Sequence, residues 1–177
     1  MRKISVLLFV AFLLSAVPSF AQDYAPFEIF GGYNFVRIDT VGEERESMNG
    51  WNISFTGNLN SALGIKAEVT GIYKTLDDDY KANGYSFMVG PQINGRFELF
   101  PGVSSVFGHA LFGTERIGVD GFDSVNYFSM AFGGGIDWGK GRVGVRAPQI
   151  DYFPLRKDGY TWNNFRIAAG IVFRLGN

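Results

Sequence analysis

The sequence predicts an all-β fold: an eight-stranded antiparallel up-and-down transmembrane β-barrel, preceded by a cleaved signal peptide. Apolar and polar side chains alternate in segment after segment, and long connections alternate with tight turns. Alternation with a period of two is typical of a strand with one apolar and one polar face. The phase that would line a small closed barrel carries the charges. A barrel with a polar interior and an apolar outer face is solvated by lipid, whereas a soluble ligand-carrying barrel shows the reverse.

The N-terminus has the features of an export signal. Arg2 and Lys3 form a basic start, Ile4–Val17 is a short apolar run, and Ser19 and Ala21 supply small residues for cleavage. We expect residues 1–21 to be a signal peptide and residues 22–177 to be the outer-membrane barrel domain. A retained membrane anchor is the alternative.

Composition excludes several classes of function. The chain has no cysteine, which removes disulfides, thiol catalysis and cysteine-based metal sites. The formal net charge is −1 and no basic patch is present, so a nucleic-acid partner is not expected. After the signal, no apolar run has the length of about 20 residues that a spanning helix needs. If this chain sits in a membrane, strands must cross it.

The first strand can be read from Phe27 to Ile38, and the others follow by the same alternation. They are expected at Gly50–Asn58, Leu63–Lys74, Tyr85–Glu98, Val103–Arg116, Asn126–Trp138, Arg142–Tyr152 and Asn164–Leu175. Most have the roughly 9–11 residues that a tilted crossing needs. Long loops are expected at Asp39–Asn49, Thr75–Gly84, Ile117–Val125 and Pro154–Asn163, and tight turns at Asn58–Ser61, Leu99–Gly102 and Gly139–Gly141. This arrangement is typical of outer-membrane barrels, whose short turns and termini lie on the periplasmic side.

The charges that fall within strands share one phase. In Leu63–Lys74, for example, Lys66 and Glu68 alternate with Ile65 and Val69. We expect an inward polar network of structural character, made of Glu28, Lys66, Glu68, Arg96, His109, Asp137, Arg146, Arg166 and Arg174. Eight strands leave an interior only wide enough for side chains, so these charges are expected to pair with one another.

One position breaks the phase. Asp151 faces lipid if Arg142–Tyr152 is counted without interruption. Pro148 cannot donate to a strand ladder, so a bulge there would turn Asp151 inward. Alternatively, the strand ends near Ala147.

The mature chain resembles the OmpA-like family of small outer-membrane barrels, in its stand-alone eight-stranded form. The likeness rests on loose motifs spread along the chain. They are Phe27-Glu28-Ile29-Phe30-Gly31-Gly32-Tyr33, Gly50-Trp51-Asn52 to Gly57-Asn58-Leu59, Phe107–Gly113, Ala131–Asp137 and Arg166–Phe173. The resemblance implies a closed barrel in the outer membrane.

Catalytic and metal-binding residues are not expected. His109 is the single histidine, and Ser105, four residues before it on the same phase, lies about 13 Å away along a strand. The resembling lipid A deacylases carry a serine two residues after their histidine, where this chain has Leu111. Asp77-Asp78-Asp79 lacks the spaced ligands of a dedicated calcium site.

The sequence therefore favours a non-enzymatic barrel protein of the cell outer membrane, reached by export through the periplasm. Its expected role is envelope structure or surface interaction through its long loops, with no cofactor. A lipid A-modifying enzyme and a small-solute, porin-like pore are the alternatives. Expected partners are outer-membrane lipid, lipopolysaccharide and the barrel-assembly machinery, and the chain is expected to be a monomer.

Overall fold

The structure is a computed structural model that describes residues 24–38, 46–77, 80–95, 101–119, 121 and 123–176. Of residues 76, 77, 80 and 81 it describes only the backbone. The expected signal peptide, residues 1–21, and the expected lumen residue Arg96 therefore lie outside the described residues. No helix in the described ranges is long and apolar enough to span a membrane.

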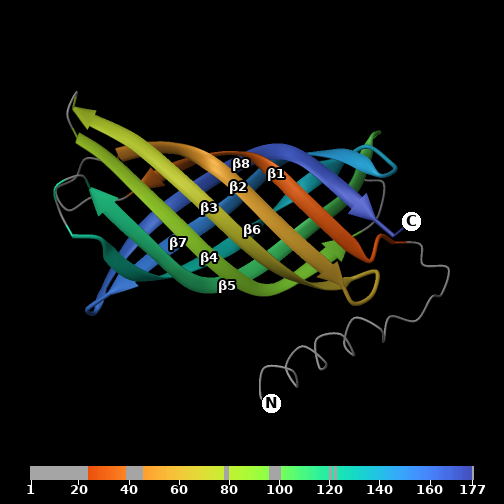
Figure 1. Ribbon diagram of the computed structural model, residues 1–177. Coiled ribbons are helices and arrows are strands. Elements are labelled where there is room, and N and C mark those ends of the chain that lie inside the picture. Colours follow the sequence, from red (N-terminus) through yellow and green to blue (C-terminus); the bar gives the residue numbers. More distant parts are fainter. Residues whose placement is uncertain are drawn as a thin grey trace, which may run out of the picture.

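Eight antiparallel strands form one closed barrel in which each strand pairs with its neighbours in sequence and β8 pairs with β1 (Figure 1). They are β1 (Phe27–Ile38), β2 (Glu46–Asn58), β3 (Leu63–Asp77), β4 (Tyr80–Gly95), β5 (Val103–Val119), β6 (Val125–Trp138), β7 (Val143–Lys157) and β8 (Tyr160–Leu175). The predicted up-and-down topology is confirmed. Closure satisfies the backbone of every strand, which lipid requires.

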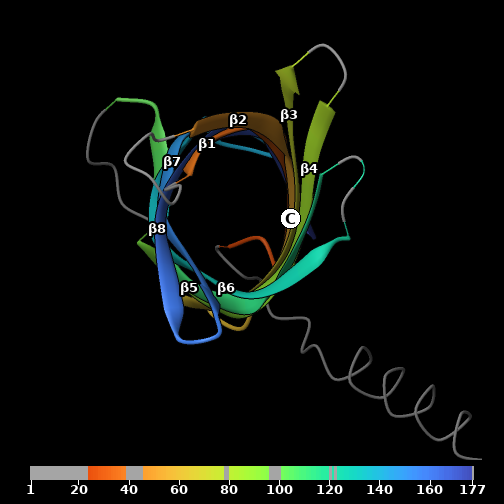
Figure 2. The ribbon, with the colours of Figure 1, turned by 90° about the vertical axis from the view of Figure 1, so that its left-hand side faces the viewer.

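The two ends of the barrel differ. At one end, here the terminal end, β1 begins and β8 ends beside the turns 59–62 and 139–142. At the other end, here the distal end, the chain passes from β1 to β2, β3 to β4, β5 to β6 and β7 to β8. Figure 2, viewed down the barrel, shows a closed ring of strands with the β3–β4 hairpin leaning out of it.

Several strands run further toward the distal end than the sequence pattern predicts. The expected long loop Pro154–Asn163 is wrong, because β7 continues to Lys157 and β8 starts at Tyr160. Asp158 and Gly159 alone connect them, with φ angles of 50° and 83°. Such paired positive φ angles suit a tight hairpin turn, for which Asp-Gly is a preferred sequence. Thr75–Gly84 is likewise mostly strand.

The physical reason is solvation. Beyond the bilayer the outward side chains meet water, while inward ones such as Leu155 pack in the apolar interior, so the apolar-out, polar-in alternation ends while the hydrogen-bonded ladder continues.

The bulge near Pro148 is present. The β7–β8 register shifts between Arg146 and Gln149, and Asp151 becomes buried. Of the two alternatives that the sequence left open, the structure has the one in which the strand continues and Asp151 turns into the lumen.

The outer wall is apolar, as predicted from the alternation. Large exposed apolar side chains follow the outward phase of every strand, among them Ile29, Ile53, Phe87 and Ile167. On a soluble protein this much exposed apolar surface would be an association hazard, whereas lipid solvates it.

The interior has two parts, of which the sequence pattern predicted one. Polar and charged side chains fill the terminal and central lumen. Toward the distal end, the inward phase is apolar instead. This apolar layer consists of Val36, Met48, Ile72, Ala82, Met88, Leu111, Ala131, Phe153 and Leu155.

Candidate functional site: the polar lumen

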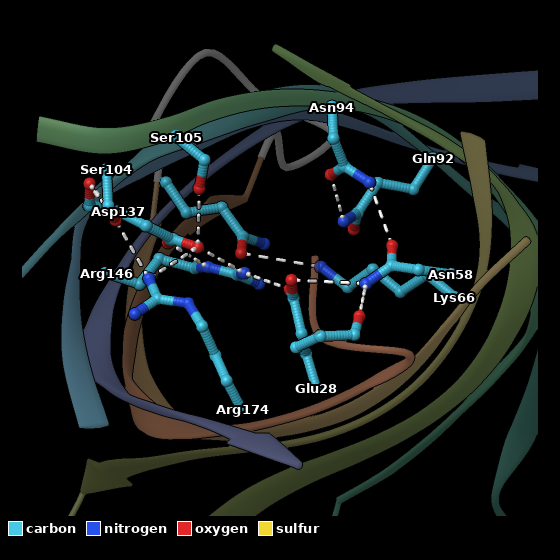
Figure 3. Close-up of polar contacts among 12 residues, drawn as sticks. Glu28, Asn58, Lys66, Gln92, Asn94, Ser104, Ser105, Asp137, Arg146 and Arg174 are labelled. Carbon is cyan, nitrogen blue, oxygen red and sulfur yellow. Dashed lines mark hydrogen bonds and ion pairs between the residues drawn. The ribbon is translucent and has the colours of Figure 1, made fainter. Parts of the chain in front are cut away.

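Most charged side chains of the lumen form two groups. The first lies at the terminal end and is centred on Arg146, whose Nε and Nη2 donate to the two carboxylate oxygens of Asp137 at 2.7 and 3.0 Å. Arg146 Nη2 also lies 3.5 Å from Glu28 Oε2. Figure 3 shows Asp137 and Arg146, from the neighbouring strands β6 and β7, side by side with Glu28 of β1 directed toward them. The two-pronged contact with Asp137 is the geometry in which a guanidinium binds a carboxylate most strongly.

Arg174 connects this terminal group to the β6–β7 turn. Its Nη1 donates to the carbonyl oxygens of Gly139 and Gly141 at 2.9 and 3.0 Å, and its Nη2 lies 3.8 Å from Asp137 Oδ2. The last strand therefore anchors the turn at the mouth of the barrel. Glu28 stands opposite Arg174 in the β1–β8 register. The side chain that lies beside the Glu28 carboxylate, however, is that of Arg146.

The second group lies at mid-height and is centred on Arg166. Its guanidinium contacts Glu68 Oε1 at 2.5 Å and Asp151 Oδ2 at 2.6 Å, and donates to Thr70 Oγ1 at 2.9 Å. Lys66 Nζ lies 2.9 Å from Glu68 Oε2. Both cations are fully buried, so each depends on these carboxylates to offset the cost of leaving water.

The two groups are balanced in charge and share one aromatic ring. Four basic side chains, Lys66, Arg146, Arg166 and Arg174, face four acidic ones, Glu28, Glu68, Asp137 and Asp151. Phe107 lies between the groups: the Arg146 guanidinium is 4.0 Å and Lys66 Nζ is 5.5 Å from its ring centroid. A ring face attracts cations, so Phe107 stabilises both groups while it fills the space between them.

The apolar layer holds polar groups that lack such partners. Glu115 and Ser129 are almost fully buried, and Glu115 Oε2 and Ser129 Oγ make no hydrogen bond in the described part of the chain. A buried carboxylate oxygen without a hydrogen bond costs free energy, so Glu115 contributes less to stability than the carboxylates of the two groups.

The expected network residues within the described ranges lie in these two groups, and the structure adds others. The sequence left Asp151 undecided because its position depends on the bulge. It also gave no reason to select Gln149, Thr70 or Phe107. Both Gln149 and Asp151 could have been recognised from the sequence. They are polar residues spaced by two that follow Pro148, and a bulge at that proline turns both side chains inward.

The surroundings of His109 are those of a polar network. Its Nε2 lies 2.9 Å from Asp151 Oδ1 and its Nδ1 lies 3.5 Å from Lys66 Nζ. Ser105 Oγ instead donates to Asp137 Oδ2 at 3.3 Å, in the terminal group. A histidine-activated hydrolase needs a nucleophile hydrogen-bonded to the histidine, and here an acid and an amine occupy both ring nitrogens.

Within the described ranges, no group of three or more His, Asp or Glu side chains is placed to hold a metal ion. Asp78 and Asp79, part of the acidic run Asp77–Asp79, lie outside the described residues.

Solved structures share this fold. Neisserial surface protein A aligns with a TM-score of 0.67 at 14% identity, over 85% of this chain and 98% of that one. Ail, the attachment invasion locus protein of Yersinia pestis, aligns with a TM-score of 0.54 at 19% identity, over 85% and 99%. The outer membrane protein OprG from Pseudomonas aeruginosa aligns with a TM-score of 0.54 at 10% identity, over 88% and 98%. All three are small outer-membrane β-barrels.

No protein-family model matches the sequence, and no curated protein matches it. At identities this low, the structural likeness shows the fold alone.

Proposed function

We propose that this chain is an exported outer-membrane barrel of the OmpA-like type, with a non-enzymatic role in envelope structure or surface interaction. In this role the terminal end faces the periplasm and the distal hairpins face the outside of the cell. Outer-membrane lipid and lipopolysaccharide surround the monomeric barrel, and the barrel-assembly machinery inserts it.

The observation that carries this proposal is the pairing of an apolar outer wall with a filled interior. The two charged groups cross the lumen, and the apolar layer lies above them toward the distal end. Ions passing through would have to displace buried ion pairs and then enter an apolar constriction, which favours a closed barrel over a porin-like pore. With the lumen filled, the distal hairpins beyond the bilayer are the part of the protein that would contact other molecules.

The decisive experiment measures two properties of a strain from which the gene has been deleted. Detergent sensitivity and surface adhesion should differ from the parent strain, and the wild-type gene should restore both. A variant in which a two-residue Asn-Gly turn replaces residues 156–161 should insert normally and restore detergent resistance but not adhesion. If the deletion changes neither property, the proposed role is wrong.

The alternatives are tested with purified protein. Stepwise conductance in planar bilayers that is lost on boiling would favour the pore. Modification of lipid A that is abolished by His109→Gln would favour the enzyme.

A further inference from the structure

The barrel wall divides at the distal end between β2 and β3. Within their described residues, the two strands pair from Asn58 and Gly64 up to Asn49 and Tyr73. Beyond that point β2 stays paired with β1 as far as Glu46, and β3 stays paired with β4. The two hairpins therefore separate, and Figure 2 shows β3 and β4 leaning away from the ring.

A pocket of about 420 Å³ occupies this division. The residues that line it are Ser47 and Asn49 from β2, Tyr73, Lys74 and Thr75 from β3, and Ala82 and Asn83 from β4. Its volume falls in the range of about 300–1,000 Å³ that is typical of small-molecule sites. Most of these side chains lie on the outward phase, which places the pocket mainly on the outer side of the barrel wall.

Hydrogen bonds hold Tyr73, the aromatic residue among those that line this pocket, in place. Trp51 Nε1 donates to Tyr73 OH at 2.8 Å, and Tyr73 OH donates to Tyr85 OH at 3.4 Å. Tyr73 as a whole residue is 41% exposed. Its hydroxyl is thus engaged by neighbouring side chains, while part of the residue remains uncovered.

The polar groups around Tyr73 are uncharged or neutralised. Tyr33 OH donates to Asn49 Oδ1 at 2.5 Å, which orients an amide that carries two further N–H donors. Lys74 Nζ pairs with Glu46 Oε2 at 2.8 Å, across the gap between the two strands. Within the part of the chain that the structure describes, the pocket thus offers amides and hydroxyls, which both donate and accept, and its one charged pair is neutral overall.

From this geometry we infer that the β2–β3 pocket binds a saccharide, with one sugar ring on Tyr73 and its hydroxyls on Asn49 and Asn83. A pyranose carries C–H groups on its faces and hydroxyls at its edge. The C–H groups suit the electron-rich face of an aromatic ring, and the hydroxyls suit neutral amides. The sugar can come from lipopolysaccharide of the same leaflet or from the surrounding medium, and the test separates these sources.

The probes are maltohexaose and the delipidated core oligosaccharide of lipopolysaccharide, titrated into refolded protein in micelles and followed by saturation-transfer NMR. Saturable binding of either probe is expected for the wild type. Binding of the core oligosaccharide alone assigns the site to the protein's own membrane, and binding of maltohexaose assigns it to sugars in solution. No saturable binding of either probe below about 10 mM overturns the inference.

Variants test whether the pocket carries that binding. Combining Asn49→Ala with Asn83→Ala should weaken binding at least about tenfold, since each lost hydrogen bond is worth about 1 kcal/mol. Tyr73→Ala should do the same, whereas Tyr73→Phe keeps the ring and should bind within about threefold of wild type. Unchanged binding in the double variant overturns the inference.

Tyr152→Ala is the matched control. Tyr152 is an exposed outward tyrosine on β7 whose hydroxyl also donates to an asparagine, Asn163. It lines no part of the pocket, so its loss should leave binding unchanged. A denaturing gel verifies that each variant folds. A closed barrel resists detergent until it is boiled, so unboiled and boiled samples of a folded variant migrate differently.

Discussion

Asp151 on β7 and Arg166 on β8 stand opposite each other in the strand register, with Arg166 Nη2 2.6 Å from Asp151 Oδ2. The same carboxylate reaches His109 on β5, and the same guanidinium reaches Glu68 on β3. One pair of side chains thus connects four strands through the middle of the barrel.

Asp151→Asn should destabilise the barrel strongly. The change leaves the buried Arg166 guanidinium with less compensation, and breaking a buried pair on one side costs about 3–5 kcal/mol. The free energy of unfolding, measured by urea titration in lipid vesicles, should fall by that amount. Asp123→Asn changes an exposed carboxylate and should stay within about 0.5 kcal/mol. Equal effects of the two changes would contradict the assigned network.

Glu115→Leu should stabilise the barrel. Glu115 is buried, its Oε2 makes no hydrogen bond in the described residues, and its Oε1 lies close to Gly84, beside Ile72. Replacing an unpaired buried polar group by an apolar one should raise the free energy of unfolding by about 1–3 kcal/mol. Glu68→Leu, the same change at a paired carboxylate, should lower it. The reasoning fails if Glu115→Leu is as destabilising as Glu68→Leu.

Gly71→Val should be costly, whereas Gly31→Val should be tolerated. The Trp51 ring lies over Gly71, where an added Cβ would come within 2.6 Å of the indole. Displacing that ring costs about 1–3 kcal/mol. Gly31 has no neighbour within 4 Å of an added Cβ, so valine there should match or exceed wild-type stability. Urea midpoints that fall equally for both variants would show that the Trp51 contact is unimportant.

Epitope insertions should report the orientation of the barrel. A tag between Asp158 and Gly159 should be labelled by antibody on intact cells, because this turn lies at the distal end. A tag between Lys140 and Gly141, in the turn at the opposite end, should be labelled only after permeabilisation. The reverse pattern would show that the barrel is inverted.

The sequence alone was sufficient for the strand count, the closed topology and the inward phase of Lys66, Glu68 and Arg146. Each of these depends on alternation across a single lipid-facing wall, and a one-residue slip would expose buried charges to lipid. Alternation is strongest in the middle of the bilayer, where the lumen is polar.

The distal part of the barrel was less predictable. Met88, Leu111 and Phe153 face inward, yet apolar residues on both faces produce no alternation. The distal end of β7 also lacks the apolar-out, polar-in alternation, because Leu155 is buried there and Arg156 is exposed. The ion-pair partners of Asp151 depend on a register shift, which only the three-dimensional pairing of β7 with β8 reveals.

The contacts across the lumen between residues far apart in the sequence also constrain the order in which the barrel can assemble. Arg166 and Thr70 are 96 residues apart, and Arg146 and Glu28 are 118 residues apart. Neither contact exists until nearly the whole chain has been synthesised and its last strands have arrived. Until then the charges of the first strands need water beside them. The ion pairs of the lumen can therefore be complete only after β8 has joined β1 and the barrel has closed.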